Sequence, residues 1–274
     1  MLEIIGEVVD RPMSSSGVGG IASVATTYDG PMAGRRIREM ARTVLSEDQR
    51  RRLHRWSRPA WLGVGRRTSP ISWSWGGERG TPIGRWYDKR FLDANAADIR
   101  GHVLEIRDTV YSSQYPALVT KVDVLDIDPD LPQVTIVGDV THMPQVASNT
   151  YDCAIVTRLF QYLRDVPAAI GELHRVLAPG GVLLCAHSGV PGRLTDLEGF
   201  ENEYAILSVR GTTTVLDEVF GGENVTVQTW GNVLACIAFL RGVAAEEVGE
   251  RRLLRSDPYF PQTITARAVK PEGA

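Results

Sequence analysis

Polar side chains close a series of short apolar runs in the middle of this 274-residue chain. Carboxylates accept hydrogen bonds from paired hydroxyl groups more strongly than neutral side chains do. A histidine titrates near neutral pH and can therefore act as a general base. We expect a site that binds a ligand and moves a proton, and its candidate members are Glu105, Arg107, Asp126, Asp128, Asp139, Arg158 and His187.

The apolar runs between Gly101 and His187 are typical of strands buried on both faces, as in a parallel sheet. In open sheets of this kind, ligands bind outside the carboxyl ends of the strands, where these polar residues lie. About five residues separate the second and third runs, which indicates either a short loop or a different pairing of one strand. The expected strands are 102–107, 121–127, 133–137, 152–157 and 181–187.

Helix signals surround these strands. A capping box over residues 46–49 begins a short basic helix, and Thr81 with Pro82 gives the N-cap and first-turn proline of a helix over about 82–97. A third helix starts after Asp165 and stops at Ala-Pro-Gly-Gly, residues 178–181. Later in the chain we expect a helix to residue 220, a strand at 224–230, a buried helix or strand at 233–240, and a final edge strand at 263–269.

Composition and charge predict an ordinary cytoplasmic protein. A net charge of -3 favours no class of partner, and no apolar run reaches the length of a membrane span. The three cysteines lie inside apolar runs, which is typical of buried free thiols. The predicted organisation is a flexible lead-in at 1–34, a helical cap at 35–98, and a main domain at 99–274 with an insertion at about 190–212.

The predicted cap is rich in arginine and tryptophan. From residue 35 to residue 90 there are fifteen Lys and Arg against five Asp and Glu, together with five of the six tryptophans. Such a segment can pack over a pocket, hold an anionic small molecule, or bind nucleic acid through phosphates and stacked bases. The acidic remainder of the chain disfavours nucleic acid, so we expect a cap.

Five segments together resemble the class I S-adenosylmethionine-dependent methyltransferases, in particular the small-molecule, type 11-like branch. They are VLEI, LDID, VGDV, YDCAIVT and ELHRVLAPGGVLL, and the resemblance covers roughly residues 82–181. The resemblance implies an α/β fold, with a Rossmann-like, mostly parallel seven-stranded sheet and helices on both faces. It also implies S-adenosylmethionine as the cofactor.

The resemblance assigns roles to the residues at the strand ends. Asp126 follows Glu105 by 21 residues, close to the spacing at which an acid after the second strand meets a ribose. Asp128 is the alternative ribose ligand, and Glu105 lies near the amino-acid end of the cofactor. The remaining implied cofactor-binding residues are Asp139 at the adenine amino group, Val140 beside the ring, and Arg158 after the fourth strand.

One segment departs from the family pattern. These enzymes follow the first strand with a glycine-rich turn, whereas residues 105–111 contain no glycine. Arg107 stands where the first glycine is expected. It can bond the carboxylate of the cofactor, or it can fill the cofactor site.

We therefore expect methyl transfer to a small-molecule acceptor, O-directed and in natural-product metabolism, with His187 as the catalytic base. Two alternatives stay open, namely a related fold that has lost methyl transfer, such as a cyclase, isomerase or accessory subunit, and a nucleic-acid methyltransferase. We expect no metal, and we expect the acceptor pocket to be walled by Trp86, Tyr87 and Tyr111.

Overall fold

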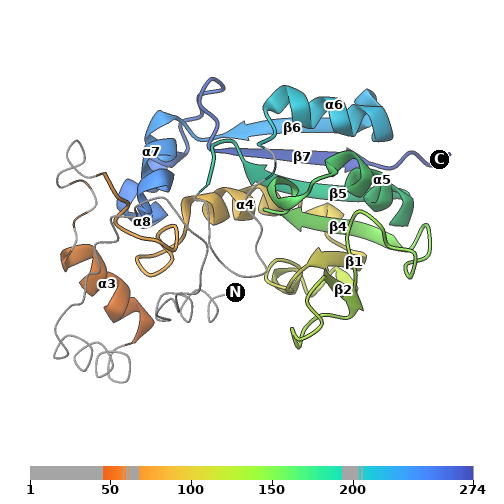
Figure 1. Cartoon of the computed structure of the whole chain (residues 1–274), viewed down its shortest axis with the longest axis horizontal. Coiled ribbons are helices and arrows are strands. Elements are labelled where there is room, and N and C mark those ends of the chain that lie inside the picture. The colour runs from red at the N-terminus through yellow and green to blue at the C-terminus, as the bar shows by residue number, and fades with distance from the viewer. Residues whose placement is uncertain are drawn as a thin grey trace, which may run out of the picture.

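The computed structural model describes residues 46–57, 59, 61, 68–192, 204 and 206–273. These residues form a seven-stranded sheet in the order β3-β2-β1-β4-β5-β7-β6 (Figure 1). The first five strands of this order are parallel, and β7 runs antiparallel to both of its neighbours. The strands are β1 (Gly101–Ile106), β2 (Val119–Asp126), β3 (Ile136–Val137), β4 (Tyr151–Thr157), β5 (Leu177–Ser188), β6 (Val225–Trp230) and β7 (Thr263–Val269).

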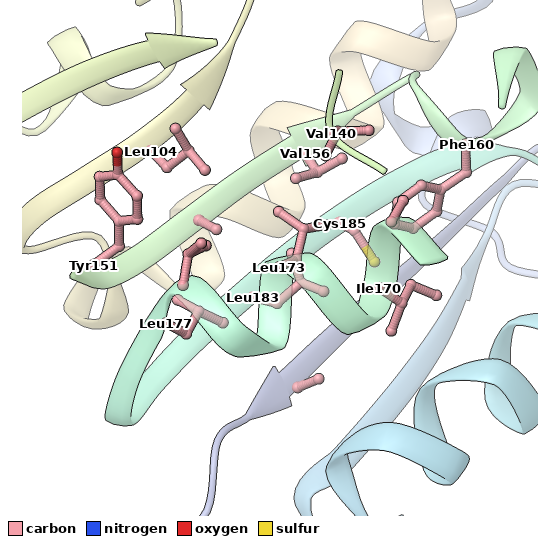
Figure 2. Close-up of a cluster of buried hydrophobic side chains, with 14 of the residues drawn as sticks. Leu104, Val140, Tyr151, Val156, Phe160, Ile170, Leu173, Leu177, Leu183 and Cys185 are labelled. Carbon is pink, nitrogen blue, oxygen red and sulfur yellow. The ribbon is translucent and has the colours of Figure 1, made fainter. Parts of the chain in front are cut away.

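Helices cover both faces of this sheet, as side-chain alternation in the strands requires. Leu104 of β1 belongs to the cluster under α5 and α6, while its neighbour Val103 packs with Phe91 of α4 on the opposite face. In Figure 2, α5 lies across β4 and β5, with Leu173 directed toward the sheet. The helices are α3 (Glu47–Ser57), α4 (Ile83–Ala94), α5 (Val166–Val176), α6 (Val209–Phe220), α7 (Val233–Arg241), α8 (Ala245–Val248) and α9 (Glu250–Leu253).

Local capping signals act as predicted for two helices. The backbone N–H groups of Ser46 and Gln49 each donate to the side chain of the other residue, which closes the capping box before α3. The carboxylate of Asp165 accepts from the N–H of Ala168 at the start of α5. The expected N-cap at Thr81 is wrong, because Thr81 donates instead to Glu246 and α4 begins after Pro82.

The predicted seven-stranded, mostly parallel α/β sheet is confirmed, but the place of β7 is not the one expected. β7 pairs with both β5 and β6, so β6 is the edge strand. The connection from β2 to β3 is a loop over residues 127–135, and β3 keeps only two residues. The segment 233–240 is helical within α7, with Val233, Ile237 and Leu240 exposed rather than buried.

The structure describes only parts of the predicted cap and insertion. The lead-in at 1–34 and most of the insertion at about 190–212 lie outside the described residues. Within the predicted cap, α3 has no buried residue and Trp56 is 80% exposed.

The three cysteines are buried and form no disulfide. Among the residues that the structure describes, no helix is both long and apolar enough to cross a membrane.

Candidate active site at the strand ends

The turn after β1 holds Arg107 in a left-handed backbone conformation, with φ of 73°. This region favours glycine, because a side chain there meets its own backbone. Two hydrogen bonds fix the conformation. The Arg107 N–H donates to the carbonyl of Leu125 at 2.9 Å, and the Arg107 carbonyl accepts from Nε2 of Gln133 at 3.0 Å. The turn therefore keeps a glycine-like backbone while it carries a cationic side chain.

Glu105 shapes the same turn from inside. Its carboxylate is buried and accepts the backbone N–H groups of Tyr111 and Ser112, each at 2.9 Å. Burial raises the pKa of Glu105 above its usual range, and these hydrogen bonds oppose the rise because they favour the charged form. Both carboxylate oxygens are thus engaged by the chain itself, so Glu105 positions the turn.

Asp126 and Arg107 face each other across the ends of β1 and β2. Nη1 of Arg107 lies 3.7 Å from Oδ2 of Asp126, and the two side chains are only 18% and 9% exposed. Oδ1 of Asp126 accepts the N–H of Asp128 at 2.9 Å. A separation of 3.7 Å is too long for a hydrogen bond, so the Asp126 carboxylate retains capacity to accept one at Oδ2.

Asp139 and Val140 follow β3. Oδ1 of Asp139 accepts from both the N–H and the hydroxyl of Thr141 at 2.8 Å. Both of these hydrogen bonds go to Oδ1, so Oδ2 of the same carboxylate can accept a further hydrogen bond. Val140 is 5% exposed and packs in the core cluster under α5. The predicted contact of Val140 with an adenine ring stays a prediction.

Arg158, directly after β4, makes a buried ion pair with α4. Its guanidinium donates to both carboxylate oxygens of Asp88, at 3.0 and 2.8 Å, and to the Thr263 hydroxyl at 2.9 Å. Asp88 is fully buried. Burial by itself would lower the pKa of Arg158, but Asp88 raises it above the usual value. A Cβ at Gly84 would lie 2.6 Å from Nη2 of Arg158, so glycine is what lets the guanidinium reach α4.

Tyr111 and His187 lie near this pair. Burial, followed by the charge of Asp88, raises the pKa of Tyr111 above its usual value. His187 is 2% exposed, and burial lowers its pKa to about 4. Nδ1 of His187 lies 3.2 Å from the carbonyl oxygen of Ser188, and Nε2 lies 2.9 Å from the hydroxyl of Thr212. His187 is therefore uncharged at neutral pH and is held at both ring nitrogens.

Two of the three aromatic residues predicted to wall the acceptor pocket are in contact, because the rings of Trp86 and Tyr87 meet edge to face with their centroids 5.0 Å apart. Tyr87 is buried within α4 and its hydroxyl donates to the carbonyl of Leu253 at 2.8 Å. Trp86 stacks under Arg90, with the guanidinium carbon 4.4 Å from the ring centroid. Trp86 also lines a pocket of about 330 Å³, formed by Thr81, Arg85, Trp86, Lys89, Arg90 and Asp93. Of the three, Tyr111 is the one that lies near Arg158.

Sequence reasoning missed Asp88, Gly84 and Thr212. Gly84 and Asp88 are four residues apart, which places them on one face of α4. That spacing is visible in the sequence, but it names no partner. Arg158 lies 70 residues further on, so only the fold shows that the two positions receive its guanidinium.

A protein family matches part of this chain, and several solved structures resemble it at low sequence identity. Residues 108–185 match the family described as a methyltransferase domain. A comparison with curated protein sequences gave no match. Among solved structures, a proposed methyltransferase from Bacillus halodurans shows 15% identity, covers 67% of this chain and 98% of its own, and gives a TM-score of 0.46. An S-adenosylmethionine-dependent methyltransferase from Archaeoglobus fulgidus shows 12% identity, with 68% and 94% covered and a TM-score of 0.46. The cyclase SpnF shows 17% identity, with 83% and 97% covered and a TM-score of 0.44.

The donors and acceptors at the strand ends fit S-adenosylmethionine at its nucleoside end. Asp126 can accept a ribose hydroxyl at Oδ2, and Asp139 has acceptor capacity beyond its bonds to Thr141. Toward the amino-acid end, the turn offers the Arg107 side chain where glycine backbone was expected. The match of residues 108–185 to a methyltransferase domain and the seven-stranded, mostly parallel sheet agree with the resemblance predicted from the sequence.

Proposed function

We propose that this protein transfers a methyl group from S-adenosylmethionine to a hydroxyl group of a small molecule, in natural-product metabolism. The observation that carries the proposal is the ion pair between Arg158 and the fully buried Asp88. It ties α4 to the carboxyl end of β4 and the start of β7, which supports our proposal that the acceptor meets the cofactor beneath this helix. A covered site of this kind favours a small acceptor over a polymer.

His187 is our candidate for the proton acceptor. With a pKa lowered to about 4 by burial, it is neutral at pH 7, and its Nε2 could accept a proton once the hydrogen bond to the Thr212 hydroxyl opens. A base of this strength is weak, so it favours an acidic hydroxyl, such as a phenol or an enol, over an alcohol. Tyr111, near Arg158, would form one wall of the acceptor pocket.

The cofactor supplies an electrophilic methyl group on a sulfonium. In our proposal Asp126 binds the ribose hydroxyls, with Asp128 as its neighbour in the same turn, and Asp139 accepts from the adenine amino group. The contribution of the protein is mainly alignment of the acceptor with the methyl group, which alone can provide effective molarities of roughly 10⁵–10⁸ M.

Calorimetric titration with S-adenosylmethionine and with S-adenosylhomocysteine tests cofactor binding. We expect micromolar binding, weakened at least about tenfold by Asp126→Ala and by Asp139→Ala, since each change removes a charged hydrogen-bond acceptor. Asp130→Ala is the matched control, because Asp130 is an exposed acid of the loop after β2 and should leave affinity unchanged. If the wild-type protein binds neither ligand, the proposed function is wrong.

A screen of phenolic and enolic acceptors, read by mass spectrometry, then tests the substrate class. His187→Gln should lower kcat at neutral pH while cofactor affinity stays unchanged. Methylation of alcohols or amines in preference to phenols would contradict the assigned acceptor class.

Arg107 motivates one second candidate, a methyltransferase fold that binds the cofactor without transferring its methyl group. A cation beside a sulfonium is unfavourable, and Arg107 lies next to the proposed ribose ligand. Under this alternative, cofactor binding would persist, no acceptor would gain a methyl group, and any chemistry on a bound substrate would survive Asp126→Ala.

A further inference from the structure

Arg107 places a positive charge where the ends of β1 and β2 meet the proposed ligand. The backbone of the turn is held on both sides, by Leu125 of β2 and by Gln133 of the following loop. The side chain leaves this fixed backbone toward β2, and its guanidinium lies 3.7 Å from Asp126. Both side chains are largely buried, so water screens this charge less than it would screen a surface arginine.

We infer that Arg107 is a specificity-determining residue, which sets the relative affinity of the site for the methyl donor and for its demethylated product. The inference rests on the proposed function, because the two ligands are taken from it. S-adenosylmethionine carries a positive sulfonium, whereas the sulfur of S-adenosylhomocysteine is uncharged. The two molecules otherwise present the same adenine, ribose and amino-acid groups to the protein.

Covalent structure brings the sulfur of either ligand close to Arg107. The sulfur is attached through one carbon atom to the ribose, and the ribose hydroxyls are the groups that Asp126 would accept. A ligand whose ribose hydroxyls bound Asp126 would therefore bring its sulfur near the guanidinium that faces the same carboxylate. The amino-acid ammonium is common to both ligands, so the sulfonium is the one positive group whose repulsion by Arg107 differs between them, and Arg107 should shift the relative affinity toward the product.

A different role for Arg107 would leave a different signature. If the guanidinium bound the amino-acid carboxylate, it would strengthen both ligands equally, since both carry that carboxylate. If it only filled the turn, neither affinity would follow its charge. The ratio of the two dissociation constants therefore isolates the proposed effect from both of these roles.

The experiment is calorimetric titration of wild type, Arg107→Gln, Arg107→Lys and Arg107→Gly with each ligand. Arg107→Gln removes the charge and keeps much of the side-chain length, and Arg107→Gly removes the charge at a position where the left-handed backbone suits glycine. Both changes should shift the ratio of the two dissociation constants in favour of S-adenosylmethionine by about fivefold. A shift of this size corresponds to the loss of a Coulomb interaction of moderate strength across a partly hydrated site. Arg107→Lys keeps the charge and should keep the ratio.

Arg251→Gln is the matched control for net charge, because Arg251 is an exposed residue of α9. It should leave the ratio unchanged. Raising the salt concentration should shrink the difference between wild type and Arg107→Gln. An unchanged ratio in Arg107→Gln and Arg107→Gly, with both ligands still bound, would overturn this inference alone. Absence of binding by wild type would overturn the proposed function together with it.

Discussion

Asp88→Asn should destabilise the fold strongly, although it exchanges side chains of nearly equal size. The change removes the charge that faces Arg158 and leaves a guanidinium only 23% exposed beside an uncharged amide. Breaking a buried ion pair by removal of one partner costs about 3–5 kcal/mol, because the remaining charge stays desolvated. Arg158 keeps its hydrogen bond to Thr263 and some contact with water, so we expect the lower end, about 3 kcal/mol.

For a protein of this size, a loss of this magnitude lowers the melting temperature by about 6 to 12 °C. Urea unfolding should show the same loss as a lower midpoint with an unchanged slope. A double-mutant cycle of Asp88→Asn with Arg158→Gln measures the coupling between the two side chains, which we expect at about 2 kcal/mol.

A second ion pair of the same geometry provides the control. Arg267 donates to both carboxylate oxygens of Asp98 at 2.8 and 2.9 Å, but its side chain is 35% exposed. Asp98→Asn should therefore cost at most about 1 kcal/mol. If Asp88→Asn costs no more than Asp98→Asn, or if the coupling with Arg158 is below about 0.5 kcal/mol, burial is not what makes this pair important.

Three further predictions concern stability. Burial holds the folded-state pKa of His187 at about 4, so the unfolded chain binds a proton at a higher pH than the folded protein does. The free energy of unfolding should therefore fall as pH drops from about 6.5 to about 4, and urea titrations of His187→Gln should show a shallower fall. Lys270→Met should cost about 1–3 kcal/mol by thermal unfolding, because it leaves Asn149 and the carbonyl of Leu177 without the buried ammonium they bind at 2.7 and 3.0 Å. Gly181→Ala should destabilise more than Gly180→Ala, since its Cβ would meet backbone oxygens at 2.7 and 2.9 Å, whereas the Cβ at Gly180 has room and is opposed only by a φ of 75°; equal melting temperatures would contradict this explanation.

Much of the fold follows from local sequence signals. The apolar runs that became β1, β4 and β5 are short and continuous, as buried parallel strands require, and the stripe after Asp165 has helical spacing. The position of β7 could not be predicted in the same way. Its sequence, TITARAV, shows that it is a strand, but its pairing depends on which partners the folded chain offers on either side.

The sequence located the candidate site to the extent that it located the ends of the strands. Asp126 and Asp139 lie at or after strand ends, as the sequence indicated, and their contacts with a cofactor stay predictions. The conformation of Arg107 was not predictable, because a left-handed arginine is stable only where other parts of the chain hold it, and Gln133 lies 26 residues away. The ion pair between Arg158 and Asp88 was not predictable either, because its two partners lie 70 residues apart in the chain.

The position of β7 between β5 and the edge strand β6 has a consequence for the order of folding. β6 precedes β7 in the chain and pairs with β7 alone, so β6 cannot join the rest of the sheet until β7 has paired with β5. Thr263, the first residue of β7, also binds Arg158, which ties completion of the sheet to closure of α4 over the strand ends. Contacts between such distant segments are slow to form, because a long loop must close first. We therefore expect a late, single kinetic step in which β6 and β7 join the sheet and α4 reaches its native position at the strand ends.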